Sequence, residues 1–330
     1  MCNSIMCSID EVKVGSLKAN ARLVVNQSAR RDPTQTTTLR NQFASAIARR
    51  FAWLRGQIWR AIVIDDVFGL RNNEVITANK EIKTNQSPGR RAFAFTSSSQ
   101  KVAAFMEWID RMVRDGILEV SDIAQVGASV DSAWTNKYVT DSYRRGVNRA
   151  RMQMKQAGYS IPIMEGGLNA LLSAPVHLDR LGLLYTRVFT ELKGITDSMD
   201  TAISRVLSQG IADGLGAETL ARQLNNTIKA GGGQLGITDS LGRYIPAERR
   251  AKLLARTEVI RAHAEGQLQE FENLGAIGVG VMAEWITAGD NRVCPQCASL
   301  EGNIYTIVEA RGKLPLHPGC RCAWIPTQPN

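Results

Sequence analysis

The sequence predicts a mainly α protein, with a helical amino-terminal region and a carboxyl-terminal α domain that ends in a small zinc-stapled β/loop knob. Three observations support this fold class. Apolar residues recur at three- and four-residue steps over several long segments, as they do on one face of a helix. Capping residues, prolines and glycines mark the ends of those segments. Four of the six cysteines fall within residues 294–322, close to the carboxyl end.

The first long helix is predicted from Asp32-Pro33, with Asp32 as its N-cap and Pro33 in its first turn. A second is predicted over about 100–114, where Asp115-Gly116 ends it, and a third over about 132–156. Short helices are expected near 168–173, 178–192, 197–209 and 218–229, and the last long helix over about 247–273.

These elements suggest a division of the chain into an amino-terminal arm, a basic helical region, a linker with short helices, and a carboxyl-terminal domain. The predicted boundaries are 1–33, 34–160, 161–195 and 196–330, with the knob at 282–326. A chain of 330 residues that is 44% hydrophobic can bury one large core or two ordinary ones, and we expect two domains.

Charge is distributed unevenly along the chain. Residues 1–160 contain 24 Lys and Arg against 14 Asp and Glu, whereas residues 161–330 contain 16 against 17. A basic half is typical of proteins that bind nucleic acid or an acidic partner, and it also serves plain solubility. The longest apolar runs fall well short of the roughly 20 residues that cross a bilayer, so no membrane partner is expected. The first residues lack the basic flank of a secretion signal, which favours a reducing cytoplasm.

The cysteine cluster has the spacing of a metal site. In a reducing compartment, clustered cysteines indicate metal more often than disulfides. A two-residue spacer lets both side chains of a turn face one ion, and two such turns complete a tetrahedral zinc site. The candidate ligands are Cys294, Cys297, His317, Cys320 and Cys322.

Five candidates compete for four places. Cys320 and Cys322 are two apart, and we expect them to face opposite sides of an extended strand. We therefore expect Cys294, Cys297 and Cys320 as ligands, with either His317 or Cys322 as the fourth. Four protein ligands leave no position for water, so the predicted zinc is structural. The segment around it has few large apolar residues and would need such a staple.

Several motifs in the same order resemble the phage Mu F-like head morphogenesis family. They are Arg256-Thr257-Glu258, the run from Glu284 to Cys297, Leu300-Glu301-Gly302, and the run from His317 to Cys322. The resemblance covers about 250–326 strongly and 196–249 weakly. It implies a family signature that includes Arg256, Thr257, Glu258, Trp285 and Asp290, which we interpret as structural, with Arg256 or Glu258 tying the long helix to the knob.

The resemblance implies a minor head (capsid) protein of a tailed bacteriophage or prophage that acts without enzymatic activity in procapsid assembly and DNA packaging at the portal vertex. Its expected partners are the portal protein and other head proteins, either major capsid or scaffold, with no small-molecule substrate. Phage DNA is compatible with the basic half. The expected location is the head interior or portal vertex of the virion, and the host cytoplasm during assembly.

Two other classes remain as alternatives. A zinc-dependent nucleobase deaminase has H-x-E followed by P-C-x-x-C, and this chain contains His263-Ala264-Glu265 ahead of Cys294. Proline follows the first cysteine here, however, and His263 and Glu265 point about 200° apart on a helix. A zinc-containing DNA-binding or nuclease protein is the other alternative, but the segment from Cys294 to Cys322 carries little net charge.

Overall fold

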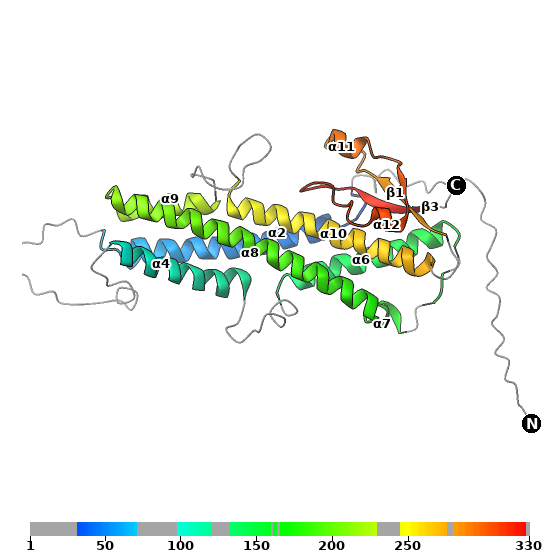
Figure 1. Cartoon of the computed structure of the whole chain (residues 1–330), viewed down its shortest axis with the longest axis horizontal. Helices are drawn as coiled ribbons and strands as arrows, with labels where there is room; N and C mark the ends of the chain where they lie inside the picture. The colour runs from blue at the N-terminus through cyan, green and yellow to red at the C-terminus, as the bar shows by residue number, and fades with distance from the viewer. Residues whose placement is uncertain are drawn as a thin grey trace, which may run out of the picture.

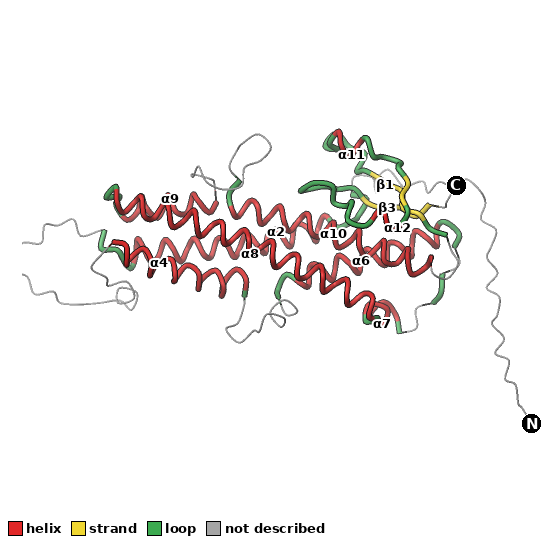
Figure 2. Tube along the Cα trace, in the orientation of Figure 1, coloured by secondary structure: helices red, strands yellow, loops and turns green. Residues whose placement is uncertain are grey.

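The computed structural model describes residues 32–70, 98–119, 133–159, 161–163, 166–229, 245–275 and 280–327. Long helices run side by side in an elongated bundle, and a small three-stranded sheet lies against one end of it (Figures 1 and 2). The predicted fold class, mainly α with a carboxyl-terminal strand knob, is confirmed. The arm at residues 1–31 and the triglycine at 231–233 lie outside the described residues.

The helix α10, Ala247–Gly275, is the central element of the bundle. It contacts α2 (Thr37–Trp59), α6 (Asn136–Gln156), α8 (Pro175–Ala212) and α9 (Ala217–Lys229). The helix α4, Ser98–Val113, packs on α8, and the short α7, Gly167–Leu172, precedes α8. Among the described helices, none is both long and apolar enough to cross a membrane.

The crossing of α6 and α10 depends on two glycines. A Cβ at Gly146 would lie 2.1 Å from the carbonyl oxygen of His263, and one at Gly266 would lie 2.4 Å from that of Tyr143. Each glycine therefore lets the backbone of the other helix approach. The hydroxyl of Ser142 donates to the carbonyl of Val259 at 2.5 Å in the same interface.

Three helix boundaries differ from the sequence prediction. The helices expected at 178–192 and 197–209 are one helix, α8, because its buried stripe continues without a break through Ile195 and Met199. Gly194 lies between the two predicted segments and is tolerated inside the helix. The first helix begins at Thr37, and Pro33 lies in the turn before it. The N-cap of α2 is Thr36 and not Asp32, although the Asp32 carboxylate accepts the N–H of Thr37 at 2.8 Å.

The second helix extends past its predicted end. After α4, a π-helical turn, η2, covers Arg114–Leu118, and a similar turn, η1, covers Arg60–Ile64 after α2. Gly116 does not end the helix but makes room for the indole of Trp53, which a Cβ would meet at 2.0 Å. Helices α6, α9 and α10 agree with their predicted ranges to within a few residues.

The knob contains an antiparallel sheet of strand order β2-β1-β3. The strands are β1, Met282–Ile286, β2, Ile304–Tyr305, and β3, Ala323–Thr327, and they alternate with the one-turn helices α11, Pro295–Ala298, and α12, Ile307–Ala310. Trp285 pairs with Trp324 across the sheet, and their rings meet edge to face with centroids 5.3 Å apart. Both are buried against the ends of α6 and α10, including Met154 and Phe271.

The predicted division into domains stays a prediction. The helix α8 runs continuously across residues 195 and 196, where the linker was expected to end. The larger core extends from Leu39 to Ala262, and the second core joins the knob to α6 and α10.

Candidate metal centre

Cys294 and Cys297 belong to the one-turn helix α11. Cys294 is its N-cap, and its Sγ accepts the backbone N–H of Cys297 at 3.3 Å. Pro295 occupies the first helical position, where its missing N–H costs nothing. The turn therefore brings both sulfur atoms to the same side, as the spacing predicts.

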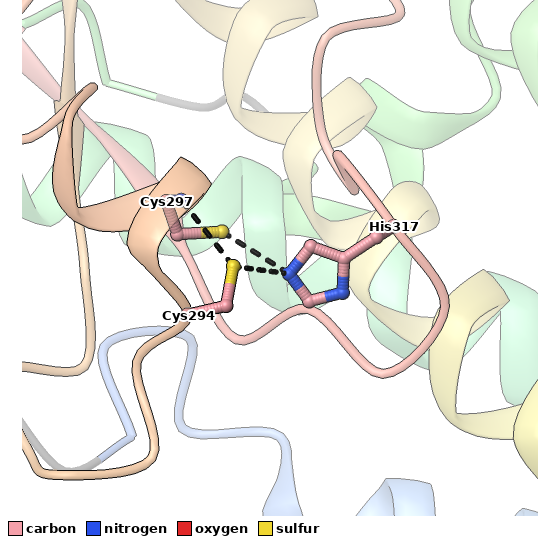
Figure 3. A group of neighbouring side chains, drawn as sticks. All are labelled: Cys294, Cys297 and His317. Atoms are coloured by element: carbon pink, nitrogen blue, oxygen red, sulfur yellow. Dashed lines mark hydrogen bonds between the residues drawn. The ribbon is translucent and has the colours of Figure 1, made fainter. Parts of the chain in front are cut away.

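His317 approaches these sulfur atoms from the loop before β3 (Figure 3). Its Nε2 lies 3.2 Å from the Sγ of Cys294 and 3.2 Å from the Sγ of Cys297. Its Nδ1 lies 3.1 Å from the carbonyl oxygen of Pro318. A hydrogen on Nδ1 donates to that carbonyl, which leaves the lone pair of Nε2 for a metal ion.

All five predicted ligands lie in this cluster, as two groups of three that share Cys297. Ligand atoms of Cys294, Cys297 and His317 lie within 4.8 Å of one another, and so do those of Cys297, Cys320 and Cys322. The Sγ atoms of Cys297 and Cys320 are 3.9 Å apart. A cavity of about 20 Å³ lies among these residues, enough for one water-sized ion.

The expectation that Cys320 and Cys322 face opposite sides is wrong. Residues two apart in an extended segment face the same side of it, and the segment from Cys320 to Cys322 leads directly into β3, which begins at Ala323. Both thiols therefore reach the cluster. All four clustered cysteines are free thiols, so the disulfide alternative is not realised.

The cluster favours ionised sulfur at two positions. Burial raises the pKa of the Cys294 thiol, but the hydrogen bonds from Cys297, together with the charge and hydrogen bond of His317, outweigh it, so the net effect is a lowered pKa. A hydrogen bond from Cys322 lowers the pKa of Cys320 to about 5. Burial raises the pKa of Cys297 to about 12, with further contribution from the nearby Cys320. A divalent cation would reverse the last effect, because it binds thiolate rather than thiol.

These donors fit a soft or borderline divalent metal. Four sulfur atoms and one imidazole nitrogen, with no carboxylate among them, are typical of zinc and atypical of magnesium or calcium. The cluster can therefore hold a metal ion. It lies between α11, the loop that carries His317 and the start of β3, so a bound metal would link these three segments.

The signature residues surround the knob in different ways. The hydroxyl of Thr257 on α10 accepts the N–H of Gly319 at 3.1 Å, so Thr257 ties the long helix to the ligand loop. We had expected Arg256 or Glu258 in this role. Arg256 is exposed, and Glu258 is buried toward α8, where Arg187 lies 3.4 Å away and Arg261 on α10 itself lies 3.1 Å away.

Asp290 and Trp285 lie within the knob itself. Asp290 receives both Nη atoms of Arg321, at 2.5 and 2.7 Å, which holds the pKa of its carboxyl well below the usual range. Because Arg321 lies between Cys320 and Cys322, this ion pair fixes the ligand segment to the loop after β1. Trp285 is fully buried.

Four contacts of the knob were not foreseen from the sequence. The carboxylate of Glu301 accepts the N–H of Thr287 at 2.6 Å, and the amide of Gln267 on α10 donates to the carbonyl of Trp324 at 3.0 Å. Arg311 pairs with Glu265 at 3.1 Å and with Glu272. Among the contacts of the knob, the Arg321–Asp290 pair alone had a signal in the sequence, because Arg321 lies inside the cysteine motif.

The residues required by the deaminase pattern lie away from the cluster. His263 is fully buried where α10 meets α6, and burial lowers its pKa to about 3. Glu265 pairs with Arg311. Neither belongs to a potential metal-binding group of the described residues.

Comparison with known proteins agrees with this geometry. Residues 201–325 match the family model described as phage Mu protein F like protein, and this range contains every candidate ligand and every signature residue. Neither the curated proteins nor the solved structures gave a match. The family is one of phage head morphogenesis, which indicates a virion component. The resemblance indicated by the sequence motifs is therefore confirmed over residues 201–325, which are similar to the carboxyl-terminal domain of phage Mu F-like proteins.

Proposed function

We propose that this protein is a minor head protein that acts in procapsid assembly and DNA packaging at the portal vertex, without enzymatic activity of its own. The observation that carries the proposal is the family match over residues 201–325, which contains both the long helix α10 and the cysteine cluster. Its partners would be the portal protein and the major capsid or scaffold protein, and phage DNA through the basic amino-terminal half.

We also propose that the metal is zinc and that its role is structural. The sulfur-rich donor set supports zinc, and five candidate donors around one small cavity can supply all four positions of a closed site. Cys297 belongs to both groups of three and is therefore the ligand that the two groups share. Whether His317 or Cys322 completes the set would be answered by X-ray absorption, since nitrogen and sulfur differ in distance to zinc by about 0.2 Å.

The assembly role can be tested in phage particles. Purified heads would be analysed by quantitative mass spectrometry, and the full chain would be co-expressed with the portal protein encoded beside it. We expect a few copies per head and co-purification with the portal. Presence of the protein only outside heads, free or on host DNA, would overturn the proposal.

The proposed absence of enzymatic activity can be tested separately. The zinc-loaded full chain would be incubated with cytosine- and adenine-containing oligonucleotides, single- and double-stranded, and assayed for deamination and strand cleavage. We expect no product. Turnover that disappears in His263→Gln would instead support the deaminase alternative.

A further inference from the structure

A second candidate site lies away from the metal, between the turn that precedes α2 and the exposed face of α6. It is a cavity of about 110 Å³, roughly the volume of three or four water molecules. Polar or cationic side chains form most of its lining, which consists of Thr34, Gln35, Arg145, Asn148, Arg149 and Met152.

Two arginines, one helical turn apart on α6, dominate this cavity. The Nε of Arg149 is buried, and among the described residues no hydrogen bond or ion pair reaches its guanidinium. Arg145 is exposed, and its Nη1 donates to the carbonyl of Gln35 at 3.3 Å, which leaves its other N–H groups available. A buried donor without an acceptor is costly, so the site favours an acceptor from outside.

The carboxylate of Asp32 does not serve as the acceptor for Arg149. Both oxygens of Asp32 are already engaged: one accepts from Thr34 at 2.9 Å and from Arg40 at 3.0 Å, and the other accepts the N–H and hydroxyl of Thr37 at 2.8 and 2.6 Å. Asp32 therefore binds the start of α2 and pairs with Arg40. Burial lowers the pKa of Arg149, and the charge of Asp32 opposes that shift without pairing with it.

We infer that this cavity binds a phosphate-type oxyanion. The planar guanidinium groups of Arg145 and Arg149 match the oxygens of a phosphate, which they can receive in paired hydrogen bonds. The amide of Asn148, exposed at the rim, provides a further donor. The inference rests on this cavity alone and does not depend on the proposed role in head assembly.

The oxyanion could be free phosphate or a phosphodiester of a nucleic acid backbone. A larger groove of about 600 Å³ lies farther along α6 and α2 and is lined by Arg49 and Lys137 on the cationic side and Asp141 on the acidic side. Lys137, Asp141, Arg145 and Arg149 follow at four-residue steps on α6, so the groove and the cavity share one helix face. An extended phosphate backbone could contact both.

The test uses the full chain, inorganic phosphate and a duplex DNA of 30 base pairs. Phosphate binding would be measured by calorimetry and DNA binding by fluorescence anisotropy over a range of salt. The test variant is Arg145→Gln with Arg149→Gln, and its matched control is Arg144→Gln with Arg205→Gln, two exposed arginines that do not line the cavity. Asn148→Glu is a second variant, which places a carboxylate at the rim and keeps both arginines.

We expect the test variant to bind phosphate at least 10-fold more weakly than the control variant. If the bound oxyanion is a phosphodiester of nucleic acid, the slope of the logarithm of the DNA-binding constant against the logarithm of the salt concentration would also fall in magnitude by about 1.8, for two lost contacts. A loss of phosphate binding with unchanged DNA affinity would support a free oxyanion as the ligand. Equal phosphate affinity in the wild type, the test variant and Asn148→Glu would overturn the inference. Melting curves followed by circular dichroism would verify that each variant is folded.

Discussion

The helical bundle and the carboxyl-terminal knob are stabilised in different ways. The bundle buries long apolar stripes from several helices, such as Leu181 to Leu207 on α8, and needs no ligand to complete its core. The knob contributes two tryptophans and a few smaller side chains, and three of its buried residues are the potential ligands Cys297, Cys320 and Cys322. Buried area therefore accounts for the stability of the bundle, whereas the knob would be stabilised by the proposed metal and by the surface of α6 and α10.

The largest expected effect comes from removing the shared ligand. Cys297→Ser should abolish metal binding and unfold the knob, because a structural zinc site contributes on the order of 10 kcal/mol of folding free energy. The near-UV circular dichroism of Trp285 and Trp324 should be lost, while the far-UV helical signal of the bundle is kept. Zinc content would be measured in parallel.

The matched control for this variant is Cys2→Ser with Cys7→Ser, which removes two thiols that lie outside the described residues. It should keep one equivalent of metal. If Cys297→Ser also retains the metal and the near-UV signal, then the knob is stabilised by packing alone, and the contrast between the two regions disappears.

A smaller effect is expected inside the bundle. Gly146→Ala places a methyl group 2.1 Å from the carbonyl oxygen of His263 and must separate α6 from α10. We expect a loss of about 3 kcal/mol in the free energy of unfolding, at the upper end of typical overpacking. Urea unfolding followed by far-UV circular dichroism would measure it.

Gly194→Ala is the control, because this glycine is also inside a helix but nothing lies within 4 Å of the added methyl group. It should stabilise the protein by about 0.5–1 kcal/mol. Similar effects of the two substitutions would show that the close approach at Gly146 is not required.

Agreement between sequence and structure also differs between the two regions. The helices of the bundle follow from periodicity, because each buried stripe is local to one segment. The helices predicted at 178–192 and 197–209 are joined into the single helix α8, which packs against α4, α9 and α10, and local periodicity within each segment does not show that continuity. In the knob, the spacing predicts which residues could bind metal, and the two-residue step between Cys320 and Cys322 is itself sufficient to place both thiols on one side. Thr257 was noted as part of a motif, but its contact with residue 319 spans 62 positions, and no local pattern encodes such a contact.

A third prediction concerns the stability of the bundle at acidic pH. His263 has a pKa of about 3 in the folded protein against an ordinary value of 6.5, so the unfolded chain binds a proton more readily. Stability is therefore fully present above pH 6.5 and is lost as pH falls toward 3. Between pH 7 and 5.5 the loss should be about 1 kcal/mol, since one pKa unit corresponds to about 1.4 kcal/mol.

His263→Gln, which does not titrate, should remove this part of the pH dependence. Far-UV melts report the bundle, while near-UV signals and metal content report the knob, whose thiolates also take up protons in acid. An unchanged far-UV pH dependence in His263→Gln would assign the acid sensitivity to the knob instead.

The smallest expected effect comes from removing the hydrogen bond that connects α10 of the bundle to the knob. Thr257→Val keeps the shape of the side chain but removes the acceptor for the Gly319 N–H, at a cost of about 1 kcal/mol. We expect faster release of the metal to a chelator, with little change in the bundle. Thr257→Ser, which keeps the hydroxyl, should behave as the wild type. Equal release rates in all three proteins would show that the hydrogen bond does not hold the ligand loop.

The core shared by the knob and the bundle has a consequence for biosynthesis. Met154 on α6 is buried beside Trp324 on β3, about 170 residues later in the chain. At a synthesis rate of roughly 5–20 residues per second, this end of α6 waits on the order of 10–30 s for its final neighbour. During that interval an apolar surface is exposed on the nascent chain. We expect chaperones to bind there, and we expect premature association between unfinished chains to begin there.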